Sequence, residues 1–161
     1  MNKLNLFAIL VVLVTLTNCS HNDNAHTTVT IPIAPPPHQV LSVVNGSVPR
    51  PTTTQALDAS VDPQKPYLTF YLEDKKTFRV GDPVPIDFTV TNAKLRSEGG
   101  EYRVRYIVDD DEMKWLDGAT PFWLAGWTSG KHTVRVELIG PDGWPYKNGN
   151  ANIVTREITV Q

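Results

Sequence analysis

The sequence predicts an all-β protein, built as an antiparallel β-sandwich of about seven strands, and two observations lead to this prediction. From Pro66 onward, apolar and polar residues alternate with a period of two over several short segments, which is the pattern of strands with one buried face. Glycine, proline, aspartate and asparagine punctuate the chain between these segments, and no segment offers capped helical periodicity. Short strands separated by turns are typical of a sandwich.

The expected strands follow one another closely through this part of the chain. They are residues 67–72, 84–91, 102–108, 113–116, 121–125, 133–139 and 153–160. The clearest is 133–139, in which Val134, Val136 and Leu138 point inward while Arg135 and Glu137 point outward. Gly–Pro and Asp–Gly turns between the strands mark where the chain reverses.

The first 18 residues have the layout of a secretory signal peptide. Lys3 supplies a positive start, and residues 6–16 form an apolar core of eleven residues. A transmembrane helix needs about 18 apolar residues or more, so this core is too short to span a bilayer by itself. A positive start, a short apolar core and a polar exit indicate export.

The only cysteine of the chain, Cys19, closes this leader in the sequence Leu16-Thr17-Asn18-Cys19. The stretch resembles the lipobox of bacterial lipoproteins, with Asn18 where that motif usually has Gly, Ala or Ser. The resemblance implies cleavage before Cys19, a diacylglycerol on its sulfur, and usually a further acyl chain on the new amine. Two or more acyl chains anchor a protein stably to a membrane. Ser20, rather than Asp, implies the outer membrane. The alternative is a plain secreted protein or an uncleaved anchor.

Residues 19–65 are expected to form a disordered, flexible tether. Eight of the 13 prolines lie before residue 67, and proline keeps the preceding residue out of the helical region. His21, His26 and His38 are scattered along this segment, and scattered histidines do not make a metal site. Residues 40–44 contain two short apolar pairs, Val40-Leu41 and Val43-Val44, and the alternative for them is a strand that docks on the domain.

The domain, residues 66–161, resembles the bacterial immunoglobulin-like domains. The resemblance rests on four motifs: Tyr102-x-Val104-x-Tyr106-x-Val108-Asp109, Pro121-Phe122-x-Leu124, Gly130-Lys131-His132-Thr133-Val134 and Pro141-Asp142-Gly143. It covers residues 67–160 and implies an immunoglobulin-like sandwich. It implies almost nothing about a ligand, because this fold carries many unrelated functions.

Aromatic residues are the candidates for a binding face in this domain. An exposed ring can stack on a sugar or anchor a protein partner. The alternative is a structural role, in which such rings fill the core. The expected binding face consists of Trp123, Trp127, Trp144 and Tyr146. Trp144 follows a Pro–Asp–Gly turn and is expected to be exposed, and Trp115 is expected to be buried.

Neither catalytic nor metal-binding residues stand out. His132 has no nucleophile at a catalytic spacing, and the resemblance gives it a structural place at the opening of a strand. Residues 109–112 are all acidic, but consecutive strand residues point to opposite faces, so a solvated acidic turn is favoured over a calcium site. The net charge is −2, and no stripe of basic residues suggests binding to nucleic acid. No cofactor, metal or enzymatic activity is expected.

The sequence therefore predicts a non-enzymatic protein of the bacterial cell envelope, held to the membrane through acylated Cys19. Its immunoglobulin-like domain is expected to bind or scaffold another envelope component. The alternative is a carbohydrate-binding surface lipoprotein that uses its exposed aromatic residues.

Overall fold

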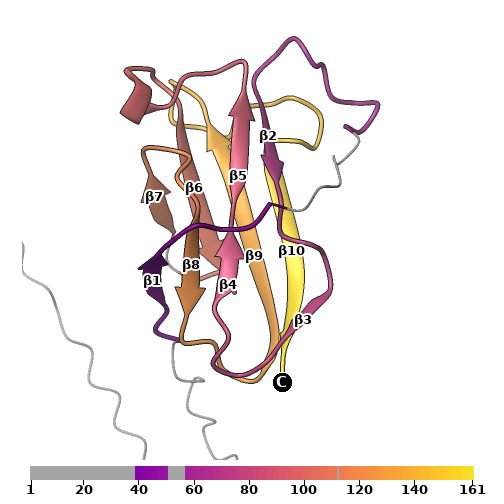
Figure 1. Cartoon of the computed structure of the whole chain (residues 1–161). Coiled ribbons are helices and arrows are strands. Elements are labelled where there is room, and N and C mark those ends of the chain that lie inside the picture. Colours follow the sequence, from indigo (N-terminus) through magenta and orange to yellow (C-terminus); the bar gives the residue numbers. More distant parts are fainter. Residues whose placement is uncertain (1–38, 51–56, 112) are drawn as a thin grey trace, which may run out of the picture. The chain divides into compact units, whose positions relative to one another are not determined.

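The computed structural model describes residues 39–50, 57–111 and 113–161 (Figure 1), which belong to one compact unit, Pro36–Gln161. These residues form ten strands and one turn of 3₁₀ helix, η1 (Arg96–Glu98). The strands pack as two layers, so the predicted all-β sandwich is confirmed. The leader and the rest of the tether lie outside the described residues.

The back layer is a five-stranded sheet with the order β3-β10-β9-β6-β7. Its bounds are β3 (Lys76–Phe78), β10 (Ile153–Val160), β9 (Gly130–Ile139), β6 (Arg103–Val108) and β7 (Lys114–Leu116). Neighbouring strands are antiparallel except for β3 and β10, which pair in parallel. The long β9 runs the length of the sandwich and joins the two loop-bearing ends (Figure 1).

The front layer consists of two small antiparallel sheets. One has the order β1-β8-β4 and the other pairs β2 with β5. Their bounds are β1 (Ser42–Asn45), β8 (Phe122–Ala125), β4 (Val84–Ile86), β2 (Tyr67–Phe70) and β5 (Phe88–Thr91). β4 and β5 follow one another along one line (Figure 1), and the chain changes its partner strand between them, where the Asp87 carbonyl accepts the Tyr71 N–H at 2.9 Å.

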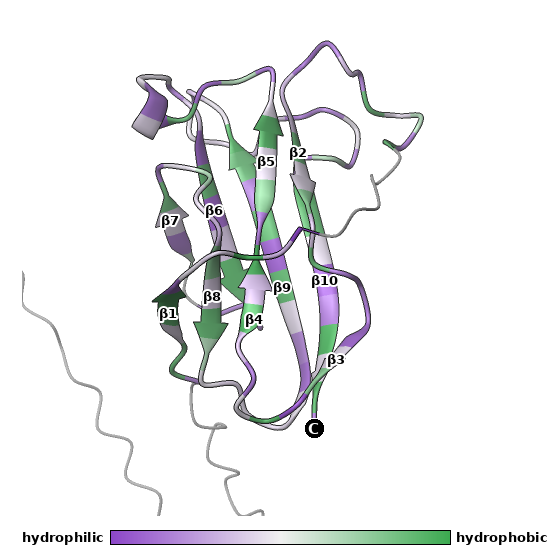
Figure 2. Ribbon diagram, viewed as in Figure 1, coloured by the Kyte–Doolittle hydropathy of each residue, from purple (hydrophilic) through white to green (hydrophobic). Residues whose placement is uncertain are grey.

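The core lies between the layers and follows the predicted alternation. In β9, Val134, Val136 and Leu138 are fully buried, and colouring by hydropathy shows the same alternation along the strands (Figure 2). The front layer contributes the inward residues of β2, β4, β5 and β8: Leu68, Phe70, Val84, Ile86, Phe88, Phe122 and Leu124. Apolar side chains from both layers thus pack into one shared core.

The described fold begins earlier in the chain than Pro66. β1 pairs with β8 over its whole length, which realises the alternative of a docked strand for residues 42–45. Val61 is buried, and the backbone N–H of Asp62 donates to Asn148 Oδ1 at 2.9 Å. Parts of the expected tether therefore belong to the sandwich.

Three elements account for the difference between ten strands and the seven expected. β1 was expected only as an alternative, β3 was not expected as a strand, and the segment 84–91 divides at Asp87 into β4 and β5. The inward alternation of Val84, Ile86 and Phe88 continues across the division, because all three remain in the core.

Candidate functional site

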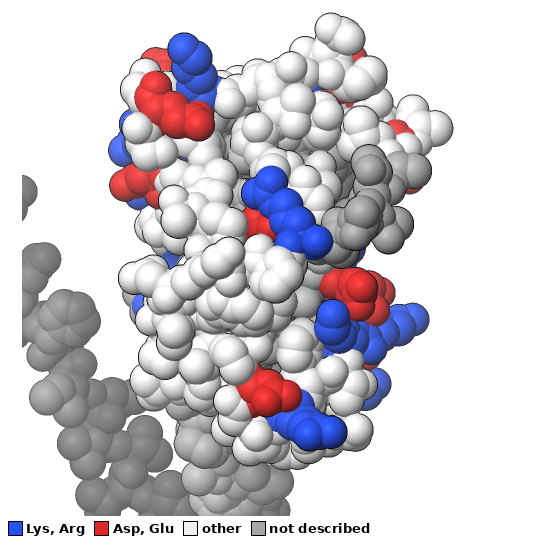
Figure 3. All heavy atoms as spheres, viewed as in Figure 1, with Lys and Arg blue, Asp and Glu red and all other residues white. Residues whose placement is uncertain are grey.

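The outward side of the front layer carries a row of uncharged side chains. The strand register places Val44 opposite Trp123, and Trp123 opposite Pro85. The residues flanking Trp123 in β8 on the inward side are buried, so the indole points away from the core. Val44 is 46% exposed. We call Val44, Trp123 and Pro85 the front row; the space-filling view shows no charged group over β1 and β8 (Figure 3).

The chain that leaves β1 crosses the front layer and partly covers Trp123. A Cβ atom at Gly46 would lie 3.4 Å from the Trp123 Nε1 atom, so the backbone passes close to the indole. Trp123 is consequently half-buried. The crossing segment, residues 46–50, lies in front of β8 in the ribbon view (Figure 1).

Arg50 fastens this crossing segment to the front layer. Its Nε donates to Asp87 Oδ2 at 2.7 Å and its Nη2 donates to Oδ1 at 3.0 Å, a bidentate pair. Asp87 is only 2% exposed, and its hydrogen bond raises the pKa of Arg50 above its ordinary value. The guanidinium also lies over the Tyr71 ring, 5.0 Å from the centroid. Asp87, the residue between β4 and β5, therefore also holds the segment that follows β1.

Trp127 lies in the core rather than on the expected binding face. Its side chain is 4% exposed, and its Nε1 donates to the Leu124 carbonyl at 2.7 Å. The indole meets the His132 ring edge-to-face, with 5.2 Å between centroids. The chain after β8 turns inward at Gly126, which has a φ of +98° that other residues rarely adopt. Trp127 is therefore a packing residue.

His132 joins two loops at the start of β9. Its Nδ1 lies 2.6 Å from Asp109 Oδ2, and its Nε2 lies 2.9 Å from the Thr128 carbonyl. The other Asp109 oxygen accepts the Thr133 N–H at 2.7 Å. These contacts assign His132 a structural place, in agreement with the interpretation drawn from the sequence.

The loop between β9 and β10 carries the most exposed of these rings. Trp144 is 72% exposed, and its backbone N–H donates to Asp142 Oδ1 at 3.1 Å. Tyr146 instead packs against the core, with its ring 5.7 Å from that of Tyr102 in an edge-to-face contact. Burial raises the pKa of Tyr102, and the nearby Tyr146, Glu101 and Asp142 raise it further.

The four aromatic residues of the expected face do not meet. Trp123 belongs to the front row, Trp127 to the core, and Trp144 and Tyr146 to the β9–β10 loop. Two separate candidates remain, the front row and the exposed ring of Trp144.

Sequence reasoning missed an exposed ring on the back layer. Trp115, expected to be buried, is 41% exposed on the outward side of β7. The Arg103 guanidinium lies 4.3 Å from its ring centroid and that of Arg105 lies 5.7 Å away. Knowledge of the strand register would have revealed this placement, because Trp115 lies opposite the outward Arg105. The sequence of one short strand does not show which residues it pairs with.

The cations around Trp115 have carboxylate partners within the same surface. Arg105 pairs with Glu137, which is 4% exposed, and Arg135 Nε lies 3.2 Å from the other oxygen of Glu137. Arg103 Nε donates to Asp117 Oδ1 at 3.0 Å. On the outward side of the back layer, the Trp115 ring therefore contacts arginines that are themselves paired with carboxylates.

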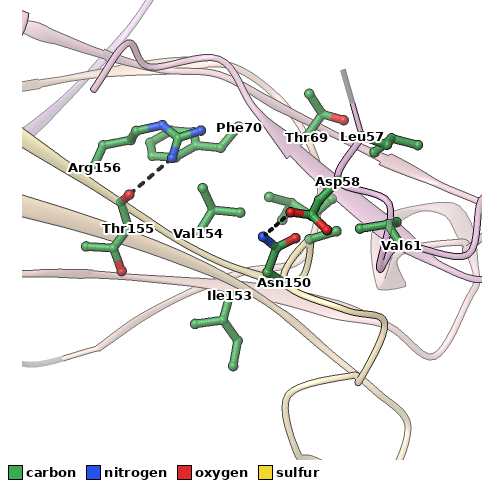
Figure 4. A pocket seen from close by; sticks show the side chains of 12 residues that line it. Leu57, Asp58, Val61, Thr69, Phe70, Asn150, Ile153, Val154, Thr155 and Arg156 are labelled. Atoms are coloured by element: carbon green, nitrogen blue, oxygen red, sulfur yellow. Dashed lines mark hydrogen bonds between the residues drawn. The ribbon is translucent and has the colours of Figure 1, made fainter. Parts of the chain in front are cut away.

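A groove of about 490 Å³ lies between β2 and β10 (Figure 4). Its walls combine apolar side chains such as Phe70 and Val154 with polar ones such as Asp58 and Asn150, all labelled in the view. At one side Asn150 donates to Asp58 at 3.4 Å, and at the other Arg156 donates to the Thr155 carbonyl at 3.2 Å. The groove adjoins Leu57, where the described chain resumes, and we assign no ligand to it.

Cys19, the expected lipid attachment, lies outside the described residues. Within the part of the chain that the structure describes, no helix is long and apolar enough to cross a membrane. The same residues contain no group of three His, Cys, Asp or Glu placed to hold a metal ion. In the acidic turn, Asp109 and Asp110 have positive φ angles, and Asp110 lies 3.8 Å from Arg135.

No protein-family model matches the chain, and no curated protein matches it significantly. Solved structures similar to it include the fibronectin(III)-like modules of Clostridium thermocellum CbhA, with 17% identity and a TM-score of 0.43 over 60% of this chain and 47% of that chain. This chain thus spans about half the length of that structure. A CARDB domain from Pyrococcus furiosus is similar with 15% identity and a TM-score of 0.36, over 60% of this chain and 94% of that chain. The fold class rests on the strand pairing described above.

Proposed function

We propose that this chain is a lipid-anchored, non-enzymatic protein of the bacterial envelope whose immunoglobulin-like domain binds or scaffolds another envelope component. The observation that carries the binding part is the front row. An outward tryptophan between Val44 and Pro85, with no charged group over β1 and β8, has the composition that protein interfaces favour at their centres. A partner that covers this row would remove apolar surface from water.

The buried titratable groups support a non-enzymatic domain. His132 is held by Asp109 and Thr128, and the carboxylate of Asp87 is held by Arg50. Glu137 is likewise held between two arginines. Each of these groups joins two elements of the fold, which is a structural role.

The anchor is tested by changing the expected acylation residue in the full chain. Cys19→Ala should move the protein from the membrane fraction to the soluble fraction, or leave it with an uncleaved leader, because neither acylation nor cleavage can then occur at that site. Ser20→Ala is the matched control and should fractionate like the wild type. A processed Cys19→Ala chain that remains in the membrane fraction would falsify the lipid anchor.

The partner is tested by placing a photoreactive phenylalanine analogue at position 123 in intact cells. Irradiation should link the chain to one envelope component, which mass spectrometry identifies. The same analogue at Val80, a 59% exposed residue outside the front row, is the control for random contact. If positions 123 and 80 capture the same molecules in the same amounts, the front row is not a binding surface.

The second candidate is a carbohydrate-binding lipoprotein, and the exposure of Trp144 favours it. A ring that is 72% exposed can stack on a sugar, and the carboxylate of Asp142 beside it can accept hydrogen bonds from hydroxyl groups. Trp144→Ala should then lower retention on cell-wall glycans about ten-fold, because one stacking contact contributes about 1–2 kcal/mol. Tyr71→Ala, remote from this loop, controls for general loss of binding. Unchanged retention of Trp144→Ala removes this candidate.

A further inference from the structure

β1 is an edge strand whose outer side has no partner among the described residues. It pairs only with β8 in the β1-β8-β4 sheet, and all four of its residues are exposed. On the far side of β8, Trp123 lies opposite Pro85, which has no N–H to share. The backbone groups of Trp123 therefore face β1 and pair with Val44. By alternation, Val43 and Asn45 direct their N–H and C=O groups outward, away from β8.

Three other edge strands, β3, β4 and β7, carry features that discourage strand pairing. β3 has Lys76, β7 has Lys114, and β4 has Pro85. Lysine and proline at an edge are the usual devices against pairing with another chain. β1 has neither, and no residue from Gln39 to Asn45 is charged. Instead its apolar residues are open to solvent, with Val43 53% and Val44 46% exposed.

We propose that β1 is an interface strand that pairs antiparallel with β1 of a second copy of this chain. A two-fold axis normal to the sheet brings the same edge of both copies together. It joins the three strands of each copy into one continuous sheet. A second copy fits because an uncharged edge meets itself without repulsion, whereas like charges placed opposite one another destabilise a strand pair. Both front rows then lie on the same side of the joined sheet.

This pairing depends on the proposed lipid anchor, which would raise the affinity of the two copies for each other. A four-residue edge buries far less than the roughly 1,000 Å² that a stable interface needs, so the dimer is weak for freely diffusing chains. Confinement of both copies to one membrane raises their effective concentration, and association then becomes favourable without any new contact. The joined sheet also doubles the front row, which gives a partner two tryptophans to engage at once.

The test uses the full chain in intact cells with one cysteine introduced at the edge. Val43→Cys, treated with a short bis-maleimide, should give a band of twice the mass of the chain, whose composition mass spectrometry confirms. Val80→Cys, of similar exposure but away from β1, should give at least about five-fold less of it. The wild type, whose only cysteine is Cys19, sets the background.

A second substitution on the same strand separates pairing from mere proximity. Adding Val44→Lys to Val43→Cys should reduce the dimer band about five-fold, because two lysines would then face one another across the pair. Adding Val44→Thr instead should leave the band intact. Equal bands from Val43→Cys and Val80→Cys, or a band unchanged by Val44→Lys, would overturn the proposal. An adduct with a different protein would show that the occupant of the edge is not a second copy.

The two proposals fail separately. If Cys19→Ala redistributes as expected but Val43→Cys remains monomeric, the anchor stands and the pairing is wrong. If Cys19→Ala stays in the membrane fraction while Val43→Cys gives the dimer, the pairing stands and only the means of confinement is wrong.

Discussion

The outward surfaces of the two layers each present a tryptophan, and the surroundings of the two rings differ. On the back layer, Trp115 lies under Arg103 and Arg105, whose charges are met by carboxylates on the same surface. On the front layer, Trp123 lies between the uncharged Val44 and Pro85. The comparison teaches that exposure alone does not mark a binding surface. A ring whose neighbours already satisfy one another has less to gain from a partner than one beside open apolar groups.

The largest expected effect comes from the core that both surfaces share. Val136→Asp buries a carboxylate without a partner, which costs several kcal/mol and so about the whole stability of a small domain. The protein should lose its cooperative thermal transition in far-UV circular dichroism. Val44→Asp, on the exposed front row, is the matched control and should still melt cooperatively. A cooperative melt of Val136→Asp would mean that the inward faces are wrongly assigned.

The next effect separates two tryptophans that lie four residues apart. Trp127→Ala should cost about 3–5 kcal/mol of unfolding free energy, because it leaves a cavity in the core. Trp123→Ala should cost about 1 kcal/mol or less, because the ring lies on the outward face. Urea denaturation of both variants measures the difference. Equal losses would place Trp123 in the core and remove the front row as a candidate surface.

A smaller effect concerns the segment that crosses the front layer. Arg50→Ala should cost about 1–3 kcal/mol, because the buried carboxylate of Asp87 then has no charged partner. Adding Asp87→Asn should recover part of this loss, since an amide is less costly to bury than a carboxylate. A double-mutant cycle on urea denaturation gives the coupling energy. Additive losses would show that the pair does not hold this segment.

The smallest effects rank the two most exposed tryptophans. Trp115→Ala should cost about 1 kcal/mol, because it removes the contacts with two guanidinium groups. Trp144→Ala should change the unfolding free energy by less than about 0.5 kcal/mol, because its ring is largely in solvent. Thermal melts of the two variants decide the order. A larger loss for Trp144→Ala would mean that the β9–β10 loop packs against the domain through this ring.

Inward faces could be predicted from the sequence because strand alternation is local. Val134, Val136 and Leu138 are buried as the pattern predicts, and so are Val84 and Ile86. The division at Asp87 could not be predicted in this way. The alternation continues through it unchanged, and only the identity of the neighbouring strand changes, which depends on residues far along the chain.

The candidate site was less predictable, because it depends on strand pairing over long distances. Trp127 follows Gly126 in a loop, where a period of two assigns no face. Ser42 pairs with Ala125, so β1 forms a strand only because it pairs with residues more than 80 positions away in the chain. The short apolar run beside prolines was therefore compatible with a tether and with a strand, and pairing with β8 decides between them.

The described chain enters and leaves the sandwich at the same pole. Thr128 donates to the Gln39 side chain at 2.9 Å, and its neighbour Ser129 donates to the Val160 carbonyl at 3.2 Å. From this pole β9 runs its ten residues, about 33 Å, to the loop that holds Trp144 at the distal tip. An epitope tag appended after Gln161 would therefore emerge on the same pole as Gln39, where the described chain begins. A tag inserted after Asp142 would project from the opposite pole, so a labelling experiment should use that loop.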